Sequence, residues 1–482
     1  MTMSTSRCTL SKAPGGLPLL GHTVPMLRDH LAFMNELPSH GDLVQIRLGP
    51  LKVIVVSSPE LTRQLLLEDA TFDKGGPLFD RIREVLGNGL ITCPHTDHRR
   101  QRRLIQPAFH RTRMPSYAKE MSGQATGIID AWTNGQLVDA TAAMQQISAR
   151  SLAATMFAGA LPPNILNQTL QDIDTILAGW AKRMVLPAVL GRIPTPGRRR
   201  YQQANGRLHR TINEVATSCR NNGTDHGDLM SILLATCDNP TPPASHRMTG
   251  GTAGADGHEI TGSRLSDTEI FDQMMTLLMA GIETAASTLA WALYLLARHP
   301  EIQQKLNAEV DLILRGGAAT YEHVPELKLA GRVVTETLRL YPPPWFVTRT
   351  AIIDTFFGGQ YVPAGTTLAY SSYLLHHRSD LFPNPERFDP DRWLPENTKN
   401  IPPDAYIPFG HGARKCAGDT FAMTEAVLVL ASVSAHWWVQ ATPNLAARRR
   451  PPRPLLGVTI KPPKLPLRVL ARTGSSYAPS PV

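Results

Sequence analysis

A segment with two alternating glycines and a single cysteine, near the C-terminal end, constrains this chain more than any other stretch. It reads Pro-Phe-Gly-His-Gly-Ala-Arg-Lys-Cys-Ala-Gly from Pro408 to Gly418. Gly410 and Gly412 can adopt a positive φ or let the backbone approach a neighbouring group closely. Because an apolar run begins at Phe421, Cys416 is predicted to lie at or near the N-terminus of a buried helix. There the helix dipole and free N–H groups favour a thiolate.

Cys416 by itself supports two interpretations. A single thiolate in an apolar setting suits haem iron, because thiolate ligation donates electron density that favours O–O cleavage. Alternatively, a lone buried cysteine is a small hydrophobic residue without chemistry, and for an isolated cysteine this is the more common case. The choice therefore depends on what the rest of the chain supplies.

The cysteine content gives no sign of a disulfide framework or a zinc site. The chain has five cysteines, an odd number, widely scattered and without a C-x-x-C pair: Cys8, Cys93, Cys219, Cys237 and Cys416. This pattern fits a reducing compartment, so we expect a cytoplasmic protein.

Charge and hydropathy indicate what the chain does not bind. The balance of 49 Lys+Arg against 40 Asp+Glu gives a net charge of +9 over 482 residues. That excess favours an acidic partner but is too diffuse to indicate nucleic acid. The N-terminus lacks the apolar core of a signal peptide, and no run of about 18 apolar residues occurs, as a spanning helix requires. We expect neither a nucleic-acid partner nor a membrane span.

Periodicity predicts several helices and two β-rich sections along the chain. A hairpin is predicted around Gly49-Pro50, a short helix over Pro59–Leu67, and a helical region from Tyr117 to about Val215. A second β-rich section is expected from Phe346 to Tyr370. The stretch Phe72–Cys93 has apolar residues at irregular spacing, and it fits a functional loop and a core helix equally well.

Residues 14–473 are expected to be ordered, between disordered tails at residues 1–13 and 474–482, and their length is compatible with two or three domains or with one large domain. Residues from about 238 to 263 are rich in Pro, Gly, Thr and Ala and have few apolar side chains. This composition predicts a flexible surface insertion rather than a domain boundary.

The longest helical pattern runs from Asp267 to His299 and contains the string Ala280-Gly281-Ile282-Glu283-Thr284-Ala285. Glycine in a helix interior costs about 1 kcal/mol relative to alanine, and the Glu-Thr pair interrupts the apolar pattern. Such local violations often mark functional sites. The pattern fits equally well a surface glutamate beside a threonine that hydrogen-bonds back to its own helix.

Two further strings place charged residues at helical spacing. Glu336 and Arg339, in a helix predicted over Leu329–Leu340, are three residues apart and face each other. His98 and Arg102 are four residues apart in the densest basic run of the chain. They share one helical face and can both point inward, although a basic run is more often a solvated surface.

Together these strings resemble those of the cytochrome P450 family. The strings F-G-x-G-x-R-x-C-x-G at Phe409–Gly418, A-G-x-E-T at Ala280–Thr284 and E-x-x-R at Glu336–Arg339 occur in the family's order. The segment Phe388–Trp393 is similar to the one that adds a third charge, here Arg392, to a buried structural network with the E-x-x-R pair. The likeness covers roughly residues 14–470. It implies a single, mainly α domain with a small β-rich lobe, which binds haem b between the cysteine helix and the long helix.

The resemblance implies roles on the cysteine side of the haem. Cys416 would be the axial thiolate ligand of the iron, and Phe409 would shield its sulfur from water. Gly410 and Gly412 would let backbone N–H groups reach the sulfur, and such bonds tune the metal. The side chains that would pair with the haem propionates are Arg414, Arg102, Arg349 and His98, the last at a position where the family often has tryptophan.

On the opposite side of the haem, the resemblance assigns roles to the long helix. Ala280 and Gly281 would leave room over the iron for dioxygen and substrate. Thr284 would hydrogen-bond dioxygen or a water beside it, and Glu283 would relay protons from solvent. Because both positions of this acid–alcohol pair are filled, the resemblance implies an ordinary monooxygenase.

The resemblance also implies partners. Electrons would come from NAD(P)H through a ferredoxin reductase and a small acidic ferredoxin, because the chain after Cys416 is too short for a fused flavin reductase. The net positive charge, with Arg414 and Lys415 beside the cysteine, is compatible with such docking. We expect the enzyme to act as a monomer.

The substrate is expected to be a hydrophobic small molecule, because the side chains expected around its pocket are almost wholly apolar. These are Leu78, Phe79, Ile82, Leu86, Ile282, Trp345, Phe346 and Val347. The N-terminal Pro14–His22 and the run His98–Phe109 are most similar to bacterial family members that oxidise cyclic sesquiterpenes, which implies hydroxylation or further oxidation of a terpenoid. A fatty-acid, other lipid or polyketide hydroxylase is the alternative.

Two other classes of protein fit the sequence less well. A haem-thiolate sensor would not need Glu283 and Thr284, and a terpene cyclase would need an Asp-rich metal motif that the sequence lacks.

Overall fold

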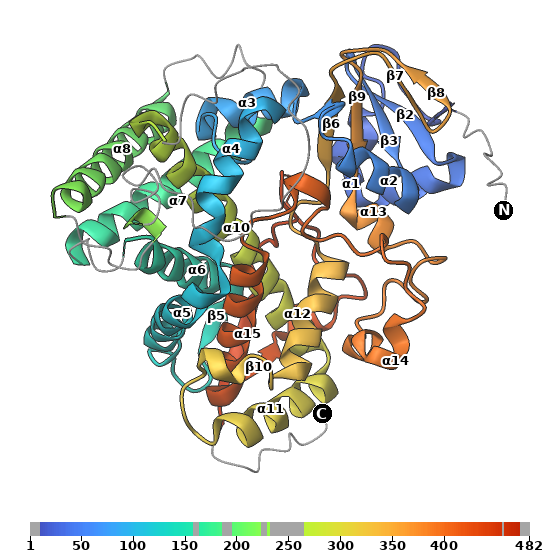
Figure 1. Cartoon of the computed structure of the whole chain (residues 1–482). Coiled ribbons are helices and arrows are strands. Elements are labelled where there is room, and N and C mark those ends of the chain that lie inside the picture. Colours follow the sequence, from blue (N-terminus) through green and yellow to red (C-terminus); the bar gives the residue numbers. More distant parts are fainter. Residues whose placement is uncertain are drawn as a thin grey trace, which may run out of the picture.

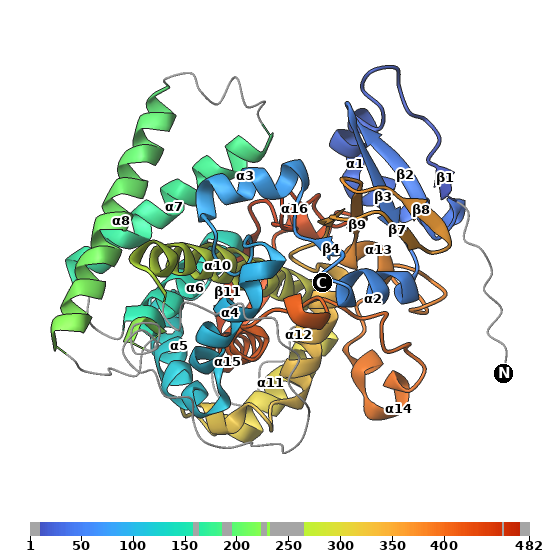
Figure 2. The ribbon, with the colours of Figure 1, turned by 45° about the horizontal axis from the view of Figure 1, so that its top comes forward.

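The long helix predicted around Glu283 is the central element of the fold. It is α10 (Asp267–Arg298), which begins with a capping box between Ser266 and Glu269. It ends one residue before the predicted limit, and Pro300 then starts α11 (Pro300–Leu314). Figures 1 and 2 show α10 passing through the helical body, where it packs against α6 (Ala140–Phe157), α12 (Lys328–Leu340) and α15 (Asp419–His436).

The computed structural model describes residues 10–157, 163–185, 195–222, 229–231, 265–455 and 457–472. The predicted insertion at residues 238–263 and the predicted tail at 474–482 lie outside these ranges. Among the described residues, α10 alone is long and apolar enough to span a membrane, but 72% of its apolar stretch is buried inside the fold. A core helix that is apolar on all sides has the same composition.

The helical body contains further helices besides these. They are α3 (Gly76–Leu86), α4 (His95–Ile105), α5 (Met114–Ile129), α7 (Pro163–Val185), α8 (Pro196–Asn222) and the short helices α14 (Pro395–Thr398) and α16 (Pro443–Ala446). Single turns of 3-10 helix occur at Gln106–Phe109, Arg111–Arg113, Tyr321–His323, Pro390–Trp393 and Gly412–Arg414. The stretch Phe72–Cys93 thus contains a helix, α3, so the core-helix interpretation holds for half of it. Gly75 precedes α3 in extended conformation and a proline stands in its first turn, as is common at helix starts.

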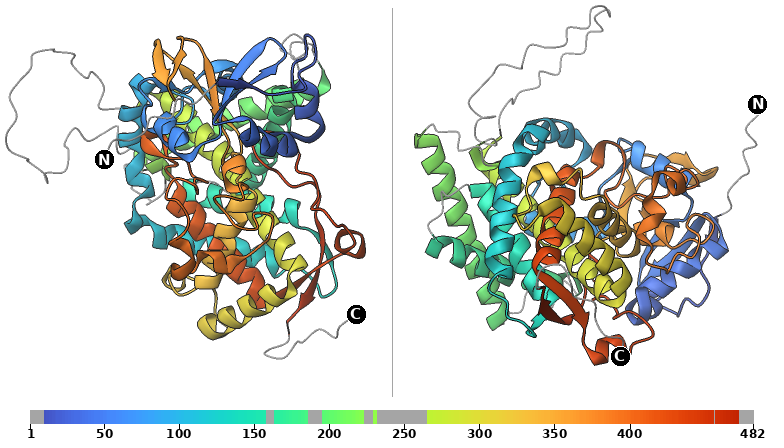
Figure 3. Two further views of the ribbon diagram at one scale, coloured as in Figure 1. Left: turned by 90° about the vertical axis from the view of Figure 1, so that its right-hand side faces the viewer. Right: turned by 90° about the horizontal axis from the view of Figure 1, so that it is seen from below.

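The β-rich lobe contains a six-stranded sheet with the order β1-β2-β3-β9-β6-β4. Its strands are β1 (Leu10–Lys12), β2 (Leu43–Leu48), β3 (Leu51–Val56), β4 (Phe72–Asp73), β6 (Val347–Ala351) and β9 (Thr367–Tyr370). The predicted hairpin is confirmed as the antiparallel pair β2–β3, in which Leu48 lies opposite Leu51. The helices α1 (Thr23–Glu36), α2 (Pro59–Leu67) and α13 (Ser372–His376) and the 3-10 turn Leu37–His40 belong to this lobe. Figure 3 shows the lobe at one end of the helical body.

Two smaller sheets complete the fold. The first has the order β10-β11-β5, from β10 (Trp437–Ala441), β11 (Pro466–Ala471) and β5 (Leu137–Asp139). The second is the exposed hairpin β7 (Thr355–Phe357) and β8 (Gln360–Val362). The sequence did not predict β5, because a three-residue strand shows no periodicity and its partner β11 lies near the other end of the chain.

The predicted N-terminal boundary is wrong for residues 10–13. Leu10–Lys12 pair in parallel with Leu43–Gln45 of β2, and the imidazole of His22 hydrogen-bonds the carbonyl of Ala13 at 3.1 Å. Residues 10–13 therefore belong to the ordered domain, while residues 1–9 lie outside the described ranges. One continuous cluster of buried apolar side chains extends from Ala13 to Val469 and joins both lobes, which makes the fold a single, mainly α domain.

Candidate functional site

The segment Pro408–Gly418 packs against α2 of the β-rich lobe and leads to the start of α15. Gly410 and Gly412 have φ values of 71° and 68°, in the left-handed region that favours glycine. A Cβ at Gly412 would lie 2.4 Å from the carbonyl oxygen of Leu66 in α2. Only glycine fits there, and the reason is close packing against α2, which the sequence did not reveal.

Cys416 lies two residues before Gly418, the N-cap of α15, so its predicted position at the start of a buried helix is confirmed. Its backbone N–H donates to the carbonyl of Phe409 at 2.9 Å. The residue keeps accessible surface, but the protein packed around its sulfur raises the pKa of the thiol, an effect that the Gly418 N–H, Arg102 and Lys74 partly oppose. A metal ion that binds a thiol deprotonates it.

Several basic side chains converge beside this segment from different elements. Arg349 of β6 and Arg414 are 2% and 8% exposed, and the Nε atoms of both lack hydrogen-bond partners. His98 of α4 is buried beside them, and its pKa is lowered to about 3 by burial and then by the charges of Arg414, Lys74 and Arg102. Burial, followed by the charges of Arg349 and Arg414, lowers the pKa of Lys74 well below its usual value.

Carboxylates compensate only part of this charge. Arg414 donates to Asp73 at 2.8 Å and to the carbonyl of Cys93 at 3.0 Å, and its Nε lies 3.6 Å from Asp69. Arg349 donates to the carbonyl of its neighbour Thr348. Buried charges and orphaned donors are costly unless a partner satisfies them. The cluster therefore has the character of an anion-binding site.

Arg102 occupies the edge of this cluster rather than its centre. Its Nη1 donates to the carbonyl of Lys415, and its Nε donates to Gln106 at 2.7 Å. Beside it lies an open surface groove of about 1020 Å³. Five arginines contribute to the lining of this groove, together with Ala417, Asp419 and Thr420 from the segment after Cys416: Arg99, Arg102, Arg103, Arg111 and Arg113.

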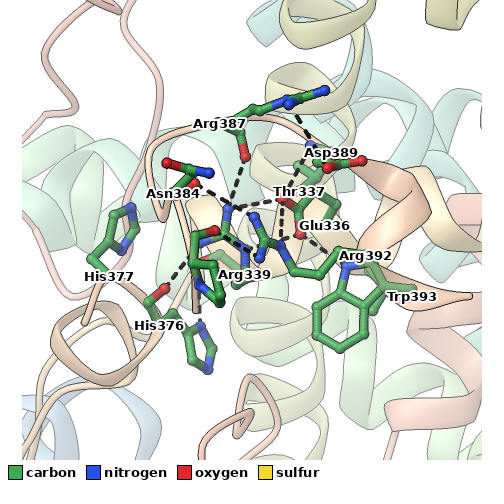
Figure 4. A network of polar contacts seen from close by, with 12 residues as sticks. Glu336, Thr337, Arg339, His376, His377, Asn384, Arg387, Asp389, Arg392 and Trp393 are labelled. Carbon is green, nitrogen blue, oxygen red and sulfur yellow. Dashed lines mark hydrogen bonds and ion pairs between the residues drawn. The ribbon is translucent and has the colours of Figure 1, made fainter. Parts of the chain in front are cut away.

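The E-x-x-R pair forms the buried network drawn in Figure 4. Glu336 and Arg339 are fully buried and joined by two hydrogen bonds, of 2.8 and 2.9 Å. Arg392 lies 3.4 Å from Glu336, as expected, and the indole of Trp393 donates to the same carboxylate at 2.8 Å. Arg339 also donates to the carbonyl of His376 at 2.9 Å, and this network connects α12 to the loop that leads to Cys416.

His376 is a member of this network that the sequence did not indicate. Its Nε2 accepts the backbone N–H of Ile407 at 3.0 Å. Complete burial, assisted by the charges of His377 and Arg339, lowers the pKa of His376 well below its usual value. The imidazole is therefore neutral and can act as this acceptor, which fixes the loop just before the cysteine segment.

The middle of α10 differs in part from expectation. A Cβ at Gly281 would lie 2.8 Å from Cδ2 of Leu152 in α6, so Gly281 allows two helices to approach each other, a packing role that the sequence did not reveal. Ile282, expected in the substrate pocket, is fully buried. The hydroxyl of Thr284 donates to the carbonyl of Ala280 at 2.6 Å, as the back-bonded alternative predicted. Thr284 and Glu283 are nevertheless only half-buried.

Comparison with known proteins identifies the fold. The model of the family described as cytochrome P450 matches residues 12–467. The chain belongs to the cytochrome P450 family. Among solved structures, the cytochrome P450DA heme domain superposes with a TM-score of 0.81 at 27% identity, over 97% of this chain and 98% of that one. The cytochrome P450 resemblance and the predicted fold class are thus confirmed.

Curated P450 relatives cover nearly the whole chain. Cyclooctat-9-en-7-ol 5-monooxygenase of Streptomyces melanosporofaciens is 41% identical over 90% of this chain and 91% of that protein. Pentalenene oxygenase of Streptomyces avermitilis is 40% identical over 98% of this chain and 99% of that protein. The chain is accordingly a P450 monooxygenase, an oxidoreductase whose family binds haem through a cysteine thiolate.

The residues around Cys416 fit such a haem. The thiol stands alone on a loop held by two left-handed glycines, as a single axial ligand requires. The cation cluster, with orphaned Nε donors on Arg349 and Arg414, is complementary to the two carboxylates of haem b. The sequence missed Lys74 in this cluster, because the residue follows β4 far from the recognised strings and only the fold brings it there.

Proposed function

We propose that this P450 monooxygenase hydroxylates or further oxidises a cyclic terpenoid, with Cys416 as the axial ligand of haem b. The observation that carries the substrate class is the similarity of about 40% over nine tenths or more of the chain to two Streptomyces enzymes named for terpenoid substrates. The apolar character of the residues near α3 and β6 supports it. Phe79, Ile82 and Leu86 are buried on α3, and Phe346 and Val347 are half-buried.

The side chains near Cys416 hold the cofactor in this proposal. When bound, the haem supplies oxygen activation, and the thiolate favours O–O cleavage. Arg349, Arg414 and Lys74 bind its propionates and thereby lose the mutual repulsion that they have without an anion, and His98 contributes a hydrogen bond. Arg102 closes the site at the surface through its bond to Lys415, and Phe409, packed against the core, keeps water from the sulfur.

Thr284 and Glu283 deliver protons in this proposal. Because the Thr284 hydroxyl donates its hydrogen bond to the carbonyl of Ala280, its oxygen remains free to accept a hydrogen bond from a water in the adjacent space. Glu283 lies next to it in α10 and can pass a proton to such a water and regain one from solvent.

Replacing Thr284 by alanine should uncouple NAD(P)H consumption from product formation, because the acceptor beside the reacting oxygen is lost. General acid–base groups contribute roughly 100-fold or more, so most reducing equivalents should appear as hydrogen peroxide. The measurement is the ratio of product to NAD(P)H with peroxide quantified in parallel. Full coupling in the Thr284→Ala variant would refute proton delivery through this residue.

The groove beside Cys416 supports the proposal that the electron donor is an acidic protein. Its five arginines and the neighbouring Lys415 give this face a positive charge, which steers a negatively charged partner. We propose that electrons pass from NAD(P)H through a ferredoxin reductase and a ferredoxin that docks there. Cys93 and Cys416 are free cysteines, which supports the proposed cytoplasmic location.

Titration of the purified haem protein with candidate substrates tests the proposed substrate class. We expect sesquiterpene and diterpene hydrocarbons, pentalenene among them, to shift the Soret band at lower concentrations than fatty acids of similar size. Product analysis with the tightest-binding compound should then show insertion of one oxygen atom. A preference for fatty acids would overturn the terpenoid assignment and favour the lipid hydroxylase.

A further inference from the structure

A short C-terminal segment is fastened against α10 and the end of α12. The indole of Trp345 donates to the carbonyl of Gly457 at 2.9 Å, and the indole of Trp291 in α10 donates to that of Ile460 at 3.0 Å. The backbone N–H of Ile460 donates to Pro343 at 2.9 Å, and Thr459 forms a β-bridge with Pro344. Backbone groups on both sides of Thr459 are thus fixed independently of its side chain.

The side chain of Thr459 reaches the acid proposed to deliver protons. Its hydroxyl donates to Oε1 of Glu283, although the two residues are far apart in sequence. Thr459 is 6% exposed, so water competes little for this bond. Glu283 is the single charged residue of α10 between Asp272 and Arg298, which makes the hydroxyl a specific partner for an isolated carboxylate.

We propose that Thr459 is a positioning residue for proton delivery, which holds the carboxyl group of Glu283 in place through the catalytic cycle. The inference rests on the proposed function of Glu283. A hydroxyl is both donor and acceptor. It can donate to the ionised carboxylate and, after rotation about its C–O bond, accept from the protonated acid.

A cationic partner would act differently from this hydroxyl. An arginine or lysine favours the ionised form of a carboxylate and opposes its protonation, whereas a relay acid has to pass through both forms. The partner that the structure gives Glu283 in the described part of the chain is neutral. This arrangement lets Glu283 release a proton toward Thr284 and regain one from solvent while its position stays unchanged.

A purely structural role for the hydroxyl is less consistent with these contacts. The segment is already attached by the bonds at Gly457 and Ile460 and by the bridge to Pro344. Valine has nearly the same shape as threonine, with a methyl group in place of the hydroxyl. Thr459→Val should therefore keep the segment in place while it releases the carboxylate.

The test compares coupling in Thr459→Val and Thr459→Ser, with the hydrocarbon that gives the largest Soret shift as the probe. We expect the ratio of product to NAD(P)H to fall about tenfold in Thr459→Val, the factor that loss of one hydrogen bond to a charged group corresponds to. Thr459→Ser restores the hydroxyl and should return the ratio to within about twofold of wild type. Thr335→Val is the matched control, because the Thr335 hydroxyl bonds only the carbonyl of Gly331 in its own helix.

Three further measurements separate this role from general damage. Haem content and the reduced-CO spectrum should be unchanged in Thr459→Val. If Thr459→Val does not bind haem, Thr459→Ala is used in its place. The double variant Thr459→Val/Glu283→Gln should be no less coupled than Glu283→Gln alone, since the two residues act as a unit.

Different outcomes overturn different claims. Wild-type coupling in Thr459→Val, with Glu283→Gln uncoupled, would refute the role of Thr459 and leave that of Glu283 intact. Additive effects in the double variant, or no recovery in Thr459→Ser, would also refute it. Wild-type coupling in Glu283→Gln would refute the proposed function of the acid itself.

Discussion

Replacing Glu336 or Arg339 by alanine is expected to give protein without haem, or insoluble protein. Both side chains are fully buried and hold each other through two hydrogen bonds. Removal of either leaves the other charge buried and unpaired, which typically costs about 3–5 kcal/mol. Because a folded domain is stable by only about 5–15 kcal/mol, such a loss affects folding directly.

The damage should spread to the cofactor site through the loop that the network holds. Glu336 accepts from Trp393 and from the backbone N–H of Asp389, while Arg339 donates to the carbonyl of His376. His376 in turn fixes the backbone at Ile407, just before the cysteine segment. Haem content per protein, measured after purification, together with soluble yield, reports this effect.

Arg332→Ala is the matched control in the same helix. Arg332 pairs with Asp391 at 3.3 Å, where the carboxylate is 53% exposed. Surface ion pairs contribute about 0–1 kcal/mol, so this variant should bind haem normally. Normal haem content in Glu336→Ala or Arg339→Ala would contradict the structural role of the network.

Replacing Cys416 by serine is expected to abolish monooxygenase activity. Serine has nearly the same size, but its oxygen cannot supply the electron density with which a thiolate favours O–O cleavage. Loss of an outer partner of a metal site already costs about 10–100-fold, and loss of the single protein ligand should cost more. The measurements are product formation and the position of the reduced-CO band, which should move away from that of thiolate-ligated haem.

Cys93→Ser provides the comparison for this variant. Cys93 is a second free cysteine, and it is buried with its sulfur 3.8 Å from Nη1 of Arg414. It has no proposed bond to iron, so the variant should keep the thiolate band. If Cys93→Ser lost the band and Cys416→Ser kept it, the ligand assignment would be wrong.

Local sequence patterns were sufficient to predict the elements that depend on residues close together in the chain. The bounds of α2 agree with prediction, since Ser58 caps the helix and a proline stands in its first turn. The hairpin β2–β3, the long helix α10 and the ion pair within α12 follow in the same way from turn residues, 3.6-residue periodicity and i, i+3 spacing. The cysteine string defined the family, because several specific residues occur there at fixed spacing.

Features that depend on distant contacts could not be predicted from the sequence. Strands β1 and β5 are three residues long and exist because partners elsewhere in the chain pair with them. Lys74 joins the cation cluster, and Thr459 reaches Glu283, only after the chain has folded. Gly281 has a packing partner, Leu152, that no local pattern identifies.

The reduced-CO difference spectrum of the wild-type protein tests the central claim most directly. Haem should be retained through purification, and the spectrum should show the red-shifted Soret band of a thiolate-ligated ferrous haem. A band at the position of histidine-ligated haem in freshly prepared, folded protein would contradict ligation by Cys416 and, with it, the proposed chemistry of the site.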